Sequence, residues 1–376
     1  MQRPSRRRSH DVSRRGFFAL AASAICAGQE PERGRVLPSV AVKYLDPATE
    51  FVVIRLTDPQ YSAVLPSGGT KALSNRMMLY ASDAAGKWEA LHMDLRSFES
   101  TVLTDAAALD PESLSFLPQE KGFWHFDGDR LGETFFSGGK NATAGRTREV
   151  YRVPDGFAKT PGVAYGDDGR SAVFVEKGER SYRLRLVDLL HGAAKTLAEA
   201  ADEITEPLVR PRHASVIYRV GPAIWTVDFA GGKKQRLNLA EGEVLQYAWA
   251  ADGHALAYLN RPADPKKLVA IREMVPETQK DAKVADTTQF ARFSANMDGS
   301  VFAGASGSKA SPYVLLLARA VKREFTLAEH KASDPRMVAP MFTPNSQGLA
   351  FQSDRHGKPA IYWMAVEKFV AKTEGS

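Results

Sequence analysis

The amino-acid sequence predicts an all-β protein in which residues 40–376 form one seven-bladed β-propeller whose ring is closed by an N-terminal strand. Three features support this prediction: a turn that recurs along the chain, a short apolar run after most of these turns, and unpaired strands at the two ends. A period of about 40–50 residues with four strands per unit is typical of propeller blades. The turns recur at intervals of 40–49 residues and are anchored at Asn75, Gly122, Gly169, His213, Gly253, Gly299 and Gly348.

The runs that follow the turns have the composition of buried strands. Residues 78–81, 255–259 and 348–351 are mainly apolar or aromatic and are bounded by turn-forming residues. Runs of this length are too short for typical helices and fit inner strands that are buried on both faces. In one of the turns, Asp252 and Gly253 supply the positive φ that a two-residue hairpin needs.

The two ends of the repeat region complement each other. The last repeat, residues 342–366, stops ten residues before the end of the chain, so it lacks an outer strand. Residues 50–57, EFVVIRLT, have the composition of an outer strand but follow no blade. Pairing the two segments would close the ring and remove exposed sheet edges. We therefore expect residues 50–57 to be the outer strand of the last blade.

The first 28 residues have the features of an export signal. An arginine-rich start leads into SRRGFF, with the pair Arg14 and Arg15, and then into an apolar stretch that ends near residue 27. This stretch is shorter than the roughly 20 apolar residues that span a bilayer. The pattern predicts a twin-arginine-type signal peptide over residues 1–28, a linker over residues 29–39 and a periplasmic or secreted, non-transmembrane protein.

Charge and cysteine content exclude several classes of protein. The formal net charge is +6, but the leader has six arginines and one acidic residue, which leaves +1 for the remaining chain. A nearly neutral body lacks the basic surface that nucleic-acid binding requires. The one cysteine, Cys26, follows the bulky Ile25, so we do not expect a lipoprotein. Without Cys26 the mature chain would have no disulfide and no thiolate metal site.

Several segments carry a resemblance to a known family. Residues 80–83, YASD, and residues 342–362, FTPNSQGLAFQSDRHGKPAIY, resemble the repeat shared by TolB-type periplasmic propellers and oligogalacturonate lyases. The opening DPAT at residues 46–49 and the inner turns at residues 249–253 and 294–299 favour the lyase family. The similarity extends over about residues 44–366.

The resemblance implies a metal-assisted β-elimination of short galacturonate oligomers. In the lyase family a divalent ion such as manganese binds the uronate carboxylate, and a basic side chain removes the proton from the adjacent carbon. Neutralising the carboxylate makes that proton acidic enough to remove. The family places a histidine before its Trp–Asp-Gly turn, and a glutamine with two histidines before its final Phe-Thr-Pro.

This sequence departs from the family pattern at each of these positions. Gln246 stands where the first histidine is expected, and residues 336–341, RMVAPM, contain no histidine. In the fourth repeat, Glu206 or Arg219 replaces the expected histidines, depending on alignment. Manganese needs several converging oxygen or imidazole ligands. We therefore predict no metal cofactor and assign no catalytic residue, while Arg336, with Gln246 and Arg219, could hold an acidic ligand.

Three functions remain open from the sequence. The first is a lyase-like propeller that binds an anionic saccharide without cleaving it. The second is an active oligogalacturonate lyase with a relocated site. The third is a TolB-like propeller that docks a protein partner on its ring face. A propeller fold alone does not choose among them, because propellers host many functions.

Overall fold

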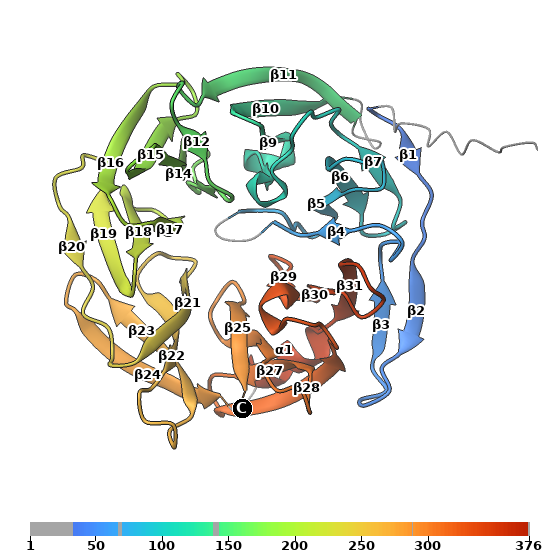
Figure 1. Cartoon of the computed structure of the whole chain (residues 1–376). Helices are drawn as coiled ribbons and strands as arrows, with labels where there is room; N and C mark the ends of the chain where they lie inside the picture. Colours follow the sequence, from blue (N-terminus) through green and yellow to red (C-terminus); the bar gives the residue numbers. More distant parts are fainter. Residues whose placement is uncertain (1–32, 67–69, 138–142, 288, 375–376) are drawn as a thin grey trace, which may run out of the picture.

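Antiparallel β-sheets stand around a common axis and form a closed ring (Figure 1). The computed structural model describes residues 33–66, 70–137, 143–287 and 289–374. Within these residues there are seven sheets, one for each predicted blade, so the seven-bladed propeller is confirmed. The signal-peptide prediction, with Arg14, Arg15 and Cys26, lies outside the described residues.

The chain builds the blades in sequence order, each from the axis outwards. Blade 1 contains β4 (Ala63–Val64), β5 (Met77–Ser82), β6 (Glu89–Asp94), β7 (Ser100–Val102) and, at its outer edge, β1 (Val36–Leu37). Blade 2 contains β8 (Ser115–Phe116), β9 (Gly122–Asp127), β10 (Arg130–Ser137) and β11 (Thr143–Arg152). Blade 3 contains β12 (Ala158–Lys159), β13 (Ala164–Tyr165), β14 (Ser171–Lys177), β15 (Tyr182–Asp188) and β16 (Ala194–Ala200). Blade 4 contains β17 (Ile204–Val209), β18 (Ser215–Val220), β19 (Ala223–Asp228) and β20 (Gln235–Arg236).

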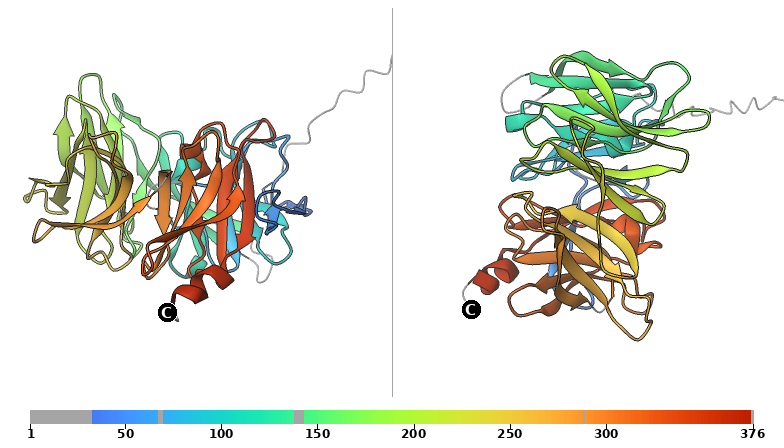
Figure 2. Two further views of the ribbon diagram at one scale, coloured as in Figure 1. Left: turned by 90° about the horizontal axis from the view of Figure 1, so that it is seen from below. Right: turned by 90° about the vertical axis from the view of Figure 1, so that its left-hand side faces the viewer.

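The remaining blades complete the ring. Blade 5 contains β21 (Glu243–Trp249), β22 (Leu256–Arg261), β23 (Val269–Val275) and β24 (Lys280–Thr287). Blade 6 contains β25 (Phe290–Ala295), β26 (Val301–Ser306), β27 (Tyr313–Ala318) and β28 (Arg323–Glu329). Blade 7 has the order β29 (Met341–Phe342), β30 (Gly348–Ser353), β31 (Ala360–Ala365), β3 (Val52–Arg55) and β2 (Val42–Leu45). The short 3-10 helices η1 (Pro111–Ser113), η2 (Pro118–Glu120) and η3 (Pro335–Val338) lie next to inner strands, and α1 (Glu367–Glu374) projects from one face of the ring (Figure 2).

The recurrent turns mark one position in every blade. Each predicted anchor lies just before the second strand of its blade or is its first residue, as Gly122 is in β9 and Gly348 in β30. Gly348 must be glycine for a packing reason, because a Cβ there would lie 2.0 Å from the Trp363 ring. The repeat period in the sequence is therefore the blade period of the structure.

Blade 7 combines strands from both ends of the chain. β3 pairs with β31 through Ile54 opposite Trp363 and Arg55 opposite Tyr362. The expectation that residues 50–57 are the outer strand was wrong in one respect, because β2 folds back on β3 and forms a fifth strand outside it. The hairpin between them also contacts blade 6, where the Asp46 carboxylate accepts a hydrogen bond from the Glu329 amide at 2.8 Å.

The linker expected over residues 29–39 is partly a strand. Its residues 36–37 form β1, which pairs with β7 through Val36 opposite Thr101 and Leu37 opposite Ser100. The linker interpretation was therefore wrong for these two residues. A two-residue strand gives no alternation of apolar and polar side chains, which is the signal that identifies strands in a sequence.

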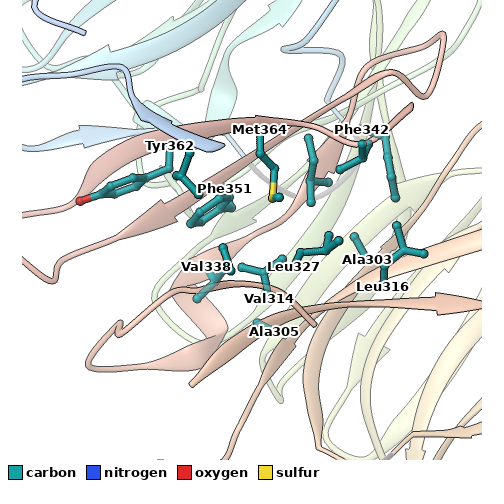
Figure 3. Packing of buried hydrophobic residues seen from close by; sticks show 14 of the residues in the cluster. Ala303, Ala305, Val314, Leu316, Leu327, Val338, Phe342, Phe351, Tyr362 and Met364 are labelled. Carbon is teal, nitrogen blue, oxygen red and sulfur yellow. The ribbon is translucent and has the colours of Figure 1, made fainter. Parts of the chain in front are cut away.

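The hydrophobic core is divided among the spaces between neighbouring blades. In the space between blades 6 and 7, Leu316 and Leu327 face Phe342, Phe351 and Met364 (Figure 3). All of these side chains are buried. Each blade therefore depends on both neighbours for burial of its apolar faces. None of the helices in the described residues is long and apolar enough to cross a membrane.

Candidate functional site

Charged side chains from four blades converge near the axis on one face of the ring. Every blade is an outward meander, so all inner strands begin at the same face. Arg292 of β25 interacts electrostatically with Glu112, Glu206 and Asp334, which precede or open the inner strands of blades 2, 4 and 7. These segments are far apart in the sequence and come close together only near the axis of the ring. We call the following residues the axial cluster: Glu112, Glu206, Arg219, Gln246, Arg292, Asp334 and Arg336.

Gln246 has both of its amide atoms bonded to a neighbouring strand. Its Nε2 donates to the Phe293 carbonyl at 3.0 Å, and its Oε1 accepts from the Phe293 amide at 2.8 Å. These bonds join β21 of blade 5 to β25 of blade 6. A ligand would compete with two backbone groups for this side chain, so Gln246 acts here as an inter-blade clasp.

Arg219 joins blades 4 and 5. Its Nε donates to the Glu206 carboxylate at 2.9 Å and its Nη2 to the Val244 carbonyl at 3.0 Å. The guanidinium also lies 5.4 Å from the ring of Tyr247, whose hydroxyl donates to the Glu206 carbonyl at 2.6 Å. Glu206 has a left-handed backbone with φ of 51°, a conformation that costs energy for a residue with a Cβ. The contacts from Arg219 and Tyr247 hold it in place.

Arg336 lies at the rim of the cluster. Its side chain is 78% exposed and forms an ion pair with Asp334 at 2.8 Å. The hydrogen bonds from Arg336 lower the pKa of the Asp334 carboxyl. An ion pair this exposed adds little to stability, because water and salt screen it. An incoming anion could therefore replace Asp334 as the partner of Arg336 at little cost.

Arg292 is the cluster residue that sequence reasoning missed. Its half-buried guanidinium donates from Nη1 to the Arg336 carbonyl at 2.7 Å, and no ion pair links it to any described carboxylate. Burial lowers its pKa, but an arginine remains charged near neutral pH. The repeat could have revealed it, because the 46-residue spacing from Gly253 to Gly299 also separates Gln246 from Arg292. Both residues follow a register shift at the start of an inner strand.

The axial cluster does not fit a manganese ion. The positions that matched the family ligands hold the clasped amide of Gln246, the guanidinium of Arg336 and the thioether of Met341. Arg292 adds another cation near the axis. Across the described ranges of the chain, no three His, Cys, Asp or Glu side chains are grouped so that they could hold a metal. Divalent manganese requires several oxygen or imidazole ligands, and adjacent guanidinium groups would repel it.

Comparison with known proteins shows that the chain is similar to one group of enzymes. The chain is 23% identical to an oligogalacturonide lyase of Pectobacterium atrosepticum and 22% identical to an oligogalacturonate lyase of Dickeya dadantii, each covering 88% of this chain and 97% of the relative. The chain is therefore similar to oligogalacturonate lyases over most of its length, at low identity. No family model matches it.

Two solved structures of these lyases share the ring. An oligogalacturonate lyase in complex with manganese and an oligogalacturonate lyase from Vibrio parahaemolyticus each superpose with a TM-score of 0.82 at 21% identity. They cover 90% of this chain, and the superposition includes 99% and 100% of their own chains. The resemblance inferred from residues 44–366 is thus confirmed at the level of the fold.

Proposed function

We propose that this chain is an exported, lyase-like propeller that binds an anionic saccharide at the axial cluster and does not cleave it. The observation that carries the proposal is Arg292, a half-buried cation near the axis with no carboxylate as an ion-pair partner in the described residues. A guanidinium in this state favours an anionic ligand, because a carboxylate can accept two parallel hydrogen bonds from it. Arg336 supplies a second cation at the rim.

The chemistry of the cluster argues against β-elimination. Arg292 could neutralise a uronate carboxylate, but the reaction also needs a base for the neighbouring carbon-bound proton. Arginine is a poor base because it stays protonated. Burial raises the pKa of Tyr247 well above its usual value, and its hydroxyl is bonded to Glu206. The cluster contains no histidine, and its carboxylates already interact with cations. Glu206 pairs with Arg219, Asp334 pairs with Arg336, and Glu112 interacts electrostatically with Arg292.

We expect the affinity for trigalacturonate to depend on Arg292. Replacing it by glutamine keeps a polar side chain but removes the charge, so the Kd measured by calorimetric titration should rise about tenfold, the effect of losing one charge-assisted hydrogen bond. Arg323→Gln is a matched control, because Arg323 is an exposed residue of the outer strand β28. Equal affinity of Arg292→Gln and the unchanged protein would contradict the proposal, provided that both have the same melting temperature.

The proposed location of this function is outside the cytoplasm. It is supported by the twin-arginine pattern of the leader, in which Arg14 and Arg15 precede an apolar stretch. Fractionation of cells that express the full chain tests this location, and mature protein confined to the cytoplasm would contradict it.

A further inference from the structure

A cavity lies between blades 3 and 4, away from the axial cluster. Its volume is about 1020 Å³, at the upper end of the roughly 300–1,000 Å³ usual for small-molecule sites. The turns that form it are residues 166–171, 188–195 and 209–214. The last of these turns precedes β18, whereas Arg219 lies near the end of that strand. The cavity is therefore on the opposite face of the ring from the axial cluster, and nothing in the proposed saccharide binding uses it.

Neighbouring blades hold the first two turns in fixed positions. Gly169 has a left-handed backbone and packs so closely on blade 2 that a Cβ would lie 2.4 Å from the Pro118 ring. Gly192 is also left-handed, and a Cβ there would lie 2.4 Å from the carbonyl oxygen of Val150. Glycine is required at both positions for conformation and for space. The two turns are thus packed against blade 2 and not free to move.

Blade 5 holds the third turn. Arg210, which is only 7% exposed, donates from Nε to the Gly253 carbonyl at 2.6 Å and pairs with Glu277 at 2.5 Å. Its guanidinium lies 5.0 Å from the ring of Trp249. Because these contacts occupy the guanidinium, we assign Arg210 to stabilising the turn and not to ligand binding. The cavity is therefore preformed, which lowers the entropy cost of binding.

The lining combines an apolar wall with cations that have no ion-pair partner. The wall comes from apolar side chains on both blades: Leu186, Val187, Leu190, Ala193, Ala194, Val209, Ala214 and Phe229. Arg170, Lys195 and Arg212 also line the cavity, and each is exposed without an ion pair to any described residue. Cations beside an apolar wall favour a ligand that has an apolar body and an acidic group.

The carboxylates that line the cavity already have hydrogen-bond or ion-pair partners. Asp167 pairs with Lys71 at 2.9 Å. Asp188 accepts the Leu190 amide at 2.8 Å and lies 3.0 Å from the His191 ring nitrogen. Asp168 accepts the backbone amide of Arg170 at 2.9 Å. The remaining titratable group of the lining is His213. These carboxylates therefore neutralise only part of the positive charge of Arg170, Lys195 and Arg212.

We propose that this cavity binds a small amphipathic anion, an apolar chain or ring system with one carboxylate or sulfonate. The apolar part would lie against Leu186, Val209 and Phe229, and the acidic group would lie near Arg212 and Lys195. Binding there would be independent of any saccharide at the axis.

Fluorescence titration with anilinonaphthalene sulfonate, an apolar anion that brightens when shielded from water, tests this proposal. We expect saturable binding to the folded protein at one site, with displacement by dodecanoate but not by the uncharged dodecyl maltoside or by trigalacturonate. Ala193→Trp, which fills the cavity from an exposed position, should abolish binding. Arg212→Glu should weaken it about tenfold, whereas the matched control Arg323→Glu on β28 should leave it unchanged.

Two results would overturn the proposal. One is absence of saturable binding to the intact chain. The other is binding of equal strength in Ala193→Trp and Arg212→Glu, because the dye would then sit elsewhere. Since both variants alter exposed residues, their melting temperatures should match that of the unchanged protein. Loss of saccharide binding at the axis would leave these results unaffected, so the two proposals can fail separately.

Discussion

Deletion of residues 29–58 is expected to prevent recovery of a soluble, monomeric propeller. The deletion removes β1, β2 and β3, and it exposes the edge of β31, whose sequence AIYWMA is mainly apolar. Val53 and Leu56, both fully buried, would be lost from the core. Each contributes about 1.5–3 kcal/mol, and an apolar unpaired strand promotes aggregation.

The measurement is soluble yield and the melting temperature after size-exclusion chromatography. Deletion of residues 2–28 is the matched control, because it removes a segment of similar length and leaves all three strands in place. A narrower variant, Thr49→Val, removes the hydrogen bonds of a single hydroxyl, which donates to the Leu327 carbonyl at 2.9 Å, lies 3.2 Å from an Asp46 carboxylate oxygen and accepts from the Phe51 amide at 3.3 Å. This variant should lower stability by about 1 kcal/mol. A soluble deletion variant with an unchanged melting temperature would refute the role assigned to these strands.

A second large effect is expected when the pH falls. His125 of β9 is 6% exposed, its Nδ1 has no hydrogen-bond partner in the described residues, and burial lowers its pKa to about 4. In the unfolded chain a histidine has a pKa near 6.5. Between these two values the unfolded state takes up a proton that the folded state does not. Stability is therefore full above about pH 6.5 and falls by roughly 3 kcal/mol as the pH drops to about 4.

Replacing His125 by phenylalanine should reduce this pH dependence. The ring would still pack beside Phe123, which lies 5.1 Å away, but it could not take up a proton. Urea midpoints of both proteins between pH 7 and pH 4.5 provide the test. Burial also lowers the pKa of His92 and His330, so the variant should keep a smaller slope of the same sign. Parallel profiles for the two proteins would contradict the assignment to His125.

The fold could be predicted because each blade repeats a turn that local chemistry requires. Gly169, Gly253 and Gly299 adopt left-handed conformations in corresponding turns, so their spacing carries the blade period into the sequence. The strands β1 and β2 escaped prediction for the opposite reason. β1 has only two residues and pairs with the distant β7, whereas β2 pairs locally with β3 but is mostly exposed, so neither has the composition of a buried strand.

The site was harder to predict than the fold. The family positions pointed to Gln246, Arg219 and Arg336 in the sequence. Arg336 pairs with the nearby Asp334, but Gln246 and Arg219 contact backbone groups that come close only in the ring. Gln246 contacts the carbonyl of Phe293, and Arg219 contacts the carbonyl of Val244. Each of these carbonyls belongs to the next blade. Arg292 lay outside the compared motifs, although the repeat spacing places it at the position equivalent to Gln246.

The central claim is that the axial cluster binds an anionic saccharide without metal-dependent cleavage. The most direct test is incubation of the purified, full-length mature protein with trigalacturonate, with added manganese and separately with chelator, while unsaturated product is followed by its ultraviolet absorbance. We expect no product under either condition and no rise in melting temperature with manganese. Formation of unsaturated galacturonate that stops when chelator is added would contradict the account, because it would require a metal site and a base that the axial cluster does not provide.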